Sequence, residues 1–186
     1  PGKIYQIRGF DLANMTFIRS DNGWIVIDVL LSKETALAGY NLLKKHVEDL
    51  PVKAVIYTHP HVDHFAGIDA ILENAPNKPE AIEIIGPKGF FEDAVSENLM
   101  AGVAWGEERP ICMAAVYLKM RKEYRYWFRT NYRGRNYGLG PSYREISEEG
   151  ETYELMVSRS YSCPYRREAP SEIMMYFPGM KAFCVA

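Results

Sequence analysis

The pattern of apolar and polar positions is most regular in the first hundred residues. Short apolar stretches predict strands at 4–8, 15–19 and 24–29. Asn22-Gly23, between the second and third, is typical of a tight hairpin turn with positive φ angles. The third stretch is almost wholly apolar over its first four residues, which indicates a strand buried on both faces. The chain therefore begins as a sheet that includes a hairpin.

After residue 32 the spacing of the apolar residues changes from the alternation of a strand to the three- or four-residue repeat of a helix. Ser32 is placed to cap a helix that extends to about Leu50, where Pro51 closes it. Apolar residues recur three or four apart along it, as one buried stripe requires. Members of this stripe are Ala36, Tyr40, Leu43 and Val47.

Strands and helices alternate beyond this point. Strands are expected at 52–57 and 81–85, the second of them broken by Gly86-Pro87, with helices at about 67–73 and 89–98. This order predicts a single α/β domain over residues 1–186, with a mixed sheet and helices outside it. The stretch 104–165 has weak periodicity and is expected to be irregular or a divergent insert.

The end of the chain again predicts strands. Apolar residues return at 173–177 and 181–185, and Pro178-Gly179 between them is a turn signal, so a hairpin is expected.

Composition narrows the functional classes. The chain has 186 residues, of which 47% are apolar and 25% charged, with a net charge of -2. These values are ordinary for a globular protein and predict no general attraction to nucleic acid or anionic membranes. We expect no membrane span, because no apolar run reaches about 18 residues. The chain begins at Pro1 without a visible signal peptide, so its cellular address cannot be read.

The cysteines and one basic segment each allow more than one functional interpretation. Three cysteines, none in a close pair, exclude a complete disulfide framework and favour free thiols. Between 119 and 135, Lys and Arg alternate with Tyr and Trp, a mixture that single-stranded nucleic acid binding uses. The alternative is an amphipathic segment whose aromatic residues pack inward, and the slightly acidic chain favours it, so we expect no nucleic-acid partner.

The strongest chemical signal is a cluster of histidines after the strand at 52–57. His59, His61 and His64, with Asp63 among them, place three of the four histidines of the chain within six residues. Imidazole and carboxylate suit Zn²⁺ and similar divalent ions. The loops at the carboxyl ends of such strands are where α/β proteins build sites. His46, on the helix, is expected to be an ordinary satisfied residue.

The spacing of the cluster predicts two metal positions. His59 and His61 lie on one face of an extended segment, whereas Asp63 and His64 lie where the chain turns into the next helix. One short segment could therefore supply His59 and His61 to one metal, and Asp63 and His64 to another. Two adjacent cations lower the pKa of a shared water and hold the oxygens of a displacement centre.

The cluster and its surroundings resemble a known family. His59-x-His61-x-Asp63-His64 is the signature of the metallo-β-lactamase superfamily. Further segments of the chain resemble one branch of this superfamily, the alkyl sulfatases. These are 8–18, 23–28, 54–59, 96–102, the Glu168-Ala169-Pro170-Ser171-Glu172 motif and 176–186.

The resemblance implies a metallo-β-lactamase-like αββα sandwich with a binuclear zinc site. It implies Glu168 as a further metal ligand, Glu172 as a structural residue, and a catalytic role for Asp63 and His64. The implied reaction is hydrolysis of alkyl sulfate esters to alcohol and sulfate by a metal-activated water. Another lactam, thioester or phosphoester hydrolase of this fold is the alternative, as is an inactive fragment of such an enzyme, because a fold does not specify a substrate.

The chain also departs from the family pattern. In the family a second glutamate follows the segment that matches 184–186, and a further histidine ligand comes later. The family continues into a helical dimerisation region and a C-terminal sterol-carrier-like region. The resemblance therefore implies an incomplete catalytic domain here, and a homodimer in the full-length protein.

Overall fold

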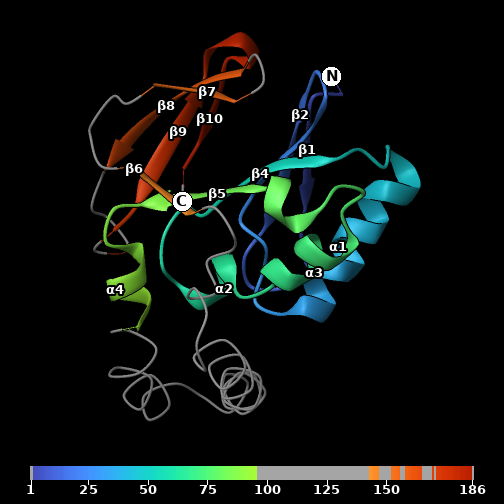
Figure 1. Cartoon of the computed structure of the whole chain (residues 1–186), viewed down its shortest axis with the longest axis horizontal. Coiled ribbons are helices and arrows are strands. Elements are labelled where there is room, and N and C mark those ends of the chain that lie inside the picture. Colours follow the sequence, from blue (N-terminus) through green and yellow to red (C-terminus); the bar gives the residue numbers. More distant parts are fainter. Residues whose placement is uncertain are drawn as a thin grey trace.

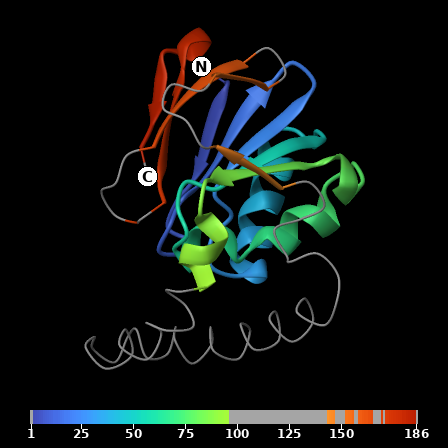
Figure 2. The same ribbon diagram turned by 60° about the vertical axis from the view of Figure 1, so that its left-hand side comes forward.

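Two sheets and a set of helices make up the fold. The computed structural model describes residues 2–95, 143–146, 152–155, 158–164, 169 and 171–185. Within them, a six-stranded sheet lies between α1 and α3 on one side and a four-stranded sheet on the other (Figures 1 and 2). The α/β class with a mixed sheet is therefore confirmed.

The six-stranded sheet has the order β1-β2-β3-β4-β5-β6. Its strands are β1 (Ile4–Ile7), β2 (Met15–Ser20), β3 (Gly23–Ile27), β4 (Val52–Ile56), β5 (Glu83–Pro87) and β6 (Tyr143–Ile146). The first three pair antiparallel, and β3 to β6 pair parallel. Parallel neighbours end at the same edge of a sheet, so the segments that follow β3 and β4 meet.

The four-stranded sheet has the order β10-β9-β8-β7 and is antiparallel throughout. Its strands are β7 (Thr152–Leu155), β8 (Ser158–Pro164), β9 (Ile173–Phe177) and β10 (Ala182–Cys184). The predicted terminal hairpin is confirmed as β9 and β10, joined by the short turn η3 (Pro178–Met180).

Helices follow the parallel strands. They are α1 (Lys33–His46), α2 (Val62–Phe65), α3 (Ile68–Asn74), the short η1 (Pro79–Ala81) and α4 (Phe90–Val95). Ser32 caps α1 as expected, since its side chain accepts a hydrogen bond from the Thr35 amide. Ala36, Tyr40 and Leu43 of the predicted stripe are buried, and Val47 is partly buried beyond the end of α1.

The strand β3 shows why the layers form. Every residue of β3 is buried, as predicted. Trp24 and Val26 belong to the core shared with the helices, whereas Ile25 and Ile27 belong to the core between the two sheets. Successive side chains of a strand point to opposite faces, so a strand that is apolar at every position requires a layer on each side.

Two boundaries differ from the sequence expectation. The helix α1 ends at His46 rather than near Leu50, since Val47 already leaves the helical conformation with φ −121° and ψ −84°. The strand β5 extends through Gly86-Pro87 instead of breaking there. Pro87 lies beyond Ile85, the last residue of β5 that pairs with β4, so the N–H that proline lacks is not needed for that pairing.

The stretch 104–165 is not irregular where the structure describes it. It contains β6, β7 and β8, whose sequences are short and polar and so carry little hydrophobic pattern. The predicted hairpin of β2 and β3 is confirmed, with Ser20 opposite Gly23, but Asn22 does not adopt a positive φ. Gly23 is required for another reason: a Cβ there would lie 2.3 Å from the Pro51 carbonyl oxygen.

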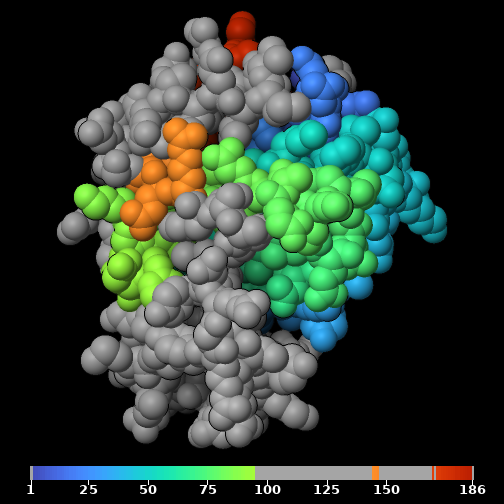
Figure 3. Space-filling model, viewed as in Figure 1, coloured from blue at the N-terminus to red at the C-terminus, as the bar shows by residue number. Residues whose placement is uncertain are grey.

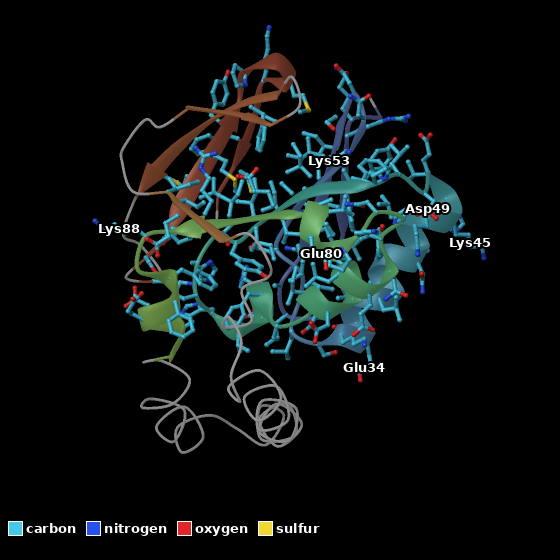
Figure 4. The ribbon with its side chains drawn as sticks, in the orientation of Figure 1. Glu34, Lys45, Asp49, Lys53, Glu80 and Lys88 are labelled. Carbon is cyan, nitrogen blue, oxygen red and sulfur yellow. The ribbon has the colours of Figure 1, made fainter. Side chains whose placement is uncertain are left out.

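Charged residues lie on the outside of the helical layer. Glu34, Lys45 and Asp49 are exposed and point away from the sheet (Figure 4). In the space-filling view, the surface formed by residues of the α3–β5 region (green) adjoins the surface formed by β4 and the end of α1 (cyan) (Figure 3). No helix in the described part of the chain is long and apolar enough to span a membrane.

Candidate metal centre

The site begins where two parallel strands end. Ile27 of β3 pairs with Ile56 of β4, and the next residue of the first strand, Asp28, donates its backbone N–H to the Ile56 carbonyl at 2.9 Å. Thr58 and His59 follow β4 after only one further residue. The sheet thereby brings Asp28 next to the histidine cluster, although 30 residues of chain separate it from Thr58.

The cluster itself changes conformation along its length. His59 is fully buried, and His61 is extended, with φ −69° and ψ 137°. Asp63 and His64 lie on the short helix α2, which the sequence pattern did not predict, since it indicated a helix only from about residue 67. The four expected ligands of the histidine cluster therefore come from one short segment that runs from the end of β4 through α2.

The histidine rings are in direct contact. His59 Nε2 lies 2.9 Å from His61 Nδ1, and the two ring centroids are 4.6 Å apart. The His59 and His64 ring centroids are 4.0 Å apart. On the helix α2, His64 Nε2 lies 3.7 Å from Asp63 Oδ2. These contacts bring the four side chains of the cluster together, and their assignment to two metals stays a prediction.

The buried carboxylate of Asp28 contacts the histidine cluster. Asp28 is 5% exposed. It accepts hydrogen bonds from the Thr58 backbone N–H at 2.9 Å and from the Thr58 hydroxyl at 2.9 and 3.1 Å. It also lies 2.8 Å from His64 Nδ1. The Thr58 hydroxyl is in turn 3.0 Å from His59 Nδ1.

The backbone around Asp28 is held in an unusual conformation. Asp28 and Leu30 have φ angles of 56° and 64°, in the left-handed region that costs non-glycine residues free energy. Hydrogen bonds to α2 and its exit compensate: Val29 N–H donates to the His64 carbonyl, and Gly67 N–H to the Leu30 carbonyl. The loop and the ligand segment are therefore fixed to each other.

Burial affects the ionisation of two groups in this region. Burial, with added repulsion from His64 and His61, lowers the pKa of His59 to about 3, so this imidazole is neutral at physiological pH, as metal ligation requires. Burial, with a smaller contribution from the Asp28 charge, raises the pKa of the Cys184 thiol to about 12. The thiol near the site is therefore protonated at neutral pH.

The donor set fits zinc. Two nitrogens bound at about 2.0–2.1 Å to a tetrahedral zinc lie about 3.3–3.4 Å apart. The His59–His61 pair, at 2.9 Å, would open by a few tenths of an ångström, and the Asp63–His64 pair, at 3.7 Å, would close by a similar amount. Imidazoles and a carboxylate are also the ligand types that zinc takes.

Further ligands are not assembled in the described residues. No group of three or more His, Cys, Asp or Glu side chains is arranged to hold a metal within 2–95 and the described segments after it. The expected ligand Glu168 lies outside the described residues. Glu172 is 3% exposed, and the next residue, Ile173, donates its N–H to the Thr58 carbonyl, which anchors β9 to the ligand segment.

Sequence reasoning missed Asp28 and Thr58 as parts of the site. A usable signal was present, because Asp28 ends one apolar strand much as His59 ends another, and adjacent parallel strands end together. The pairing of β3 with β4 is what makes this signal meaningful.

The sequence matches a known family and named relatives within it. The sequence profile described as "Metallo-beta-lactamase superfamily" matches residues 8–154. The chain is 36% identical over 186 residues to the linear primary-alkylsulfatase of a Pseudomonas species, covering 98% of this chain and 27% of that protein. It is 46% identical over 102 residues to an (R)-specific secondary-alkylsulfatase from Pseudomonas, covering 55% and 15% of the two chains.

The fold has a similar neighbour among solved structures. The stereoselective inverting sec-alkylsulfatase Pisa1 from Pseudomonas superposes with a TM-score of 0.72 at 29% identity. The match covers 97% of this chain and 29% of that one. The chain thus spans less than a third of the length of each of these relatives.

Proposed function

Since the chain belongs to the metallo-beta-lactamase superfamily, we propose that it is a metal-dependent hydrolase that cleaves alkyl sulfate esters to alcohol and sulfate. The proposal depends on one observation. Four ligand-type side chains lie together just after β4, with His59 next to His61 and Asp63 next to His64. The relatives named above act on alkyl sulfates by name, which supports this substrate class.

The proposed cofactor is a pair of zinc ions. His59 and His61 would hold one, and Asp63 and His64 the other, with Glu168 as a fifth ligand. Bound zinc would supply an activated water near neutral pH and would polarise the sulfate oxygens. In this proposal Asp63 and His64 also serve catalysis, because they belong to the pair on the outer turn of the segment.

The residues of the chain contribute binding and orientation. His59 is fully buried, so its donor nitrogen is held in a region of low dielectric, where electrostatic interactions are stronger than in water. His61 and His64 are partly exposed, so the cluster extends from a buried ring to side chains that solvent reaches. The homodimer implied by the family stays a prediction.

Turnover of dodecyl sulfate tests the function. The purified chain, loaded with Zn²⁺, should release sulfate, and His61→Ala should lose at least about 100-fold, since one ligand of a pair is removed. His46→Ala is the matched control, because His46 is an exposed histidine at the end of α1 and should retain full activity.

Measuring the metal content tests the proposed metal centre independently of the proposed substrate class. Elemental analysis should find two zinc ions per chain and fewer in His61→Ala. Metal-loaded protein that cleaves a lactam, thioester or phosphoester but not dodecyl sulfate would overturn the substrate class and leave the centre intact. Chain that neither retains zinc nor cleaves any of these esters would contradict the whole proposal.

A further inference from the structure

Two aromatic side chains flank the ligand segment at its two ends. Tyr57 comes two residues before His59, and Phe65 directly follows His64. Both rings pack on a third ring, that of Phe90 from the helix α4. We infer that Phe90 is a positioning residue that holds the two ends of the ligand segment together, so that its four donors stay close enough to bind metal. The inference rests on the proposed function only for the metal.

The three rings contact one another pairwise. The Tyr57 and Phe90 rings are stacked, with centroids 5.2 Å apart and an interplanar angle of 18°. The Phe65 ring meets Phe90 edge-on, at 5.3 Å and 76°, and meets Tyr57 at 6.1 Å and 63°. Aromatic pairs favour such separations and orientations, and all three side chains are buried. One ring, that of Phe90, therefore contacts both ends of the ligand segment.

Phe90 reaches this place because β5 runs parallel to β4. The Tyr57 N–H donates to the Ile85 carbonyl of β5 at 2.8 Å. The chain then leaves β5, turns at Gly89, whose φ of 80° suits glycine, and enters α4 with Phe90 as its first residue. This turn brings α4 beside the short helix α2, where Phe65 meets Phe90 (Figure 1). A residue distant in sequence thus completes the support of the ligand segment.

The helix α2 depends on this packing for its stability. It has only four residues and no side-chain hydrogen bond at its N-cap, His61, and a helix so short is not stable by itself. Phe65 is the one buried residue of α2, and Val62 is partly buried against the same core. The Phe65 ring is therefore the main side-chain attachment of the helix that carries Asp63 and His64.

Loss of the Phe90 ring should release this end of the ligand segment. If α2 moves away from the end of β4 for part of the time, Asp63 and His64 separate from the other two donors. A metal then binds only the fraction of chains in which the four donors are together, and the apparent affinity falls in proportion to that fraction. A core residue without this role would lower the stability of the whole chain and leave the metal affinity of the folded chain unchanged.

Amide hydrogen exchange of the metal-free chain measures the release directly. Phe90→Leu removes the ring and retains an apolar side chain. The amides of His64, Ala66 and Gly67, which donate to backbone carbonyls of this region, should then exchange about 10-fold faster, since two aromatic pairs are lost. The amides of β3 report the stability of the whole fold and should change less. Unchanged exchange at these three amides would overturn the inference.

Phe17→Leu is the matched control. Phe17 is as buried as Phe90, belongs to the same core, and also contacts two aromatic rings, those of Trp24 and Tyr40. Its loss should lower the urea midpoint by a similar amount without selective exchange at the ligand segment. Equal acceleration there in both variants, at equal urea midpoints, would show that Phe90 contributes only to general stability. If Phe90→Leu fails to fold, Phe90→Met, which retains more of the volume, takes its place.

Cobalt titration adds a readout of metal binding that needs no turnover. Phe90→Leu should bind Co²⁺ about 10-fold more weakly than the wild type, and Phe17→Leu should bind it equally well. Phe65→Leu should weaken binding as Phe90→Leu does, and the double variant should bind little more weakly than either, because the two residues form one contact. Losses that add fully in the double variant would contradict a shared role.

The two readouts separate this inference from the proposed function. A wild-type chain that binds no cobalt and cleaves no alkyl sulfate would contradict the function, and hydrogen exchange of the metal-free chain would still decide the role of Phe90. Conversely, an active wild-type chain whose exchange and cobalt affinity are unaffected by Phe90→Leu would retain the proposed function and refute this inference.

Discussion

Gly67 follows the ligand segment and lies close to the backbone before and at the start of α1, so Gly67→Ala should be strongly destabilising. A Cβ at this position would lie 2.1 Å from the Val29 carbonyl oxygen, 2.7 Å from Ala36 Cβ and 2.9 Å from the Ser32 carbonyl oxygen. Two of these neighbours are backbone atoms, so a change of side-chain rotamer cannot relieve the contact.

The magnitude can be worked from these contacts. Overpacking in a well-packed site costs about 1–3 kcal/mol. Moving the backbone to relieve it would also stretch the Gly67 N–H bond to Leu30 and the Val29 N–H bond to His64, each worth about 1 kcal/mol. We expect the free energy of unfolding to fall by about 3–5 kcal/mol in total. At about 2–4 °C per kcal/mol for a chain of this size, the melting temperature should fall on the order of 10 °C.

Urea and thermal unfolding followed by far-ultraviolet circular dichroism measure this loss. Gly179→Ala is the matched control, because a Cβ at Gly179 meets nothing within 4 Å, and its effect should stay within about 0.5 kcal/mol. A Gly67→Ala chain that unfolds at the same urea concentration as Gly179→Ala would show that the close approach at Gly67 does not hold the ligand segment in place.

Two further predictions concern the helix α1. Ser32→Ala removes the hydroxyl that accepts from the Thr35 amide and should lower the free energy of unfolding by about 1 kcal/mol, with Ser32→Asp as the capping control; equal stability of the three chains would refute the cap. Burial, and to a smaller extent the charge of Asp49, raises the pKa of Tyr40, whose hydroxyl lacks a hydrogen-bond partner among the described residues. A raised pKa in the folded state stabilises the protein fully below about pH 10, the ordinary tyrosine value, and less as the pH rises above it. Tyr40→Phe should therefore be no less stable at pH 7, and its unfolding midpoint should fall less steeply above pH 10 than that of the wild type; parallel curves would contradict the assignment.

Local sequence patterns predicted much of the first half of the fold. The strands near 4–7, 15–20 and 52–56, the Ser32 cap and the terminal hairpin follow from the apolar period and turn residues close in sequence. The histidine cluster was also predictable, because four ligand-type side chains within six residues need no distant partner to be brought together. The strands within 143–164 were not predicted, because they are short and polar.

Contacts between distant segments decided the rest of the site. The residues 59–64 alone identify the ligand side chains but not the buried groups that hold them, because those groups lie in a distant part of the sequence. The parallel pairing of β3 with β4 places Asp28 against Thr58 and His64, and only this pairing joins the carboxylate to the cluster. A side chain's type follows from the sequence, whereas its hydrogen-bond partner depends on which strands lie side by side.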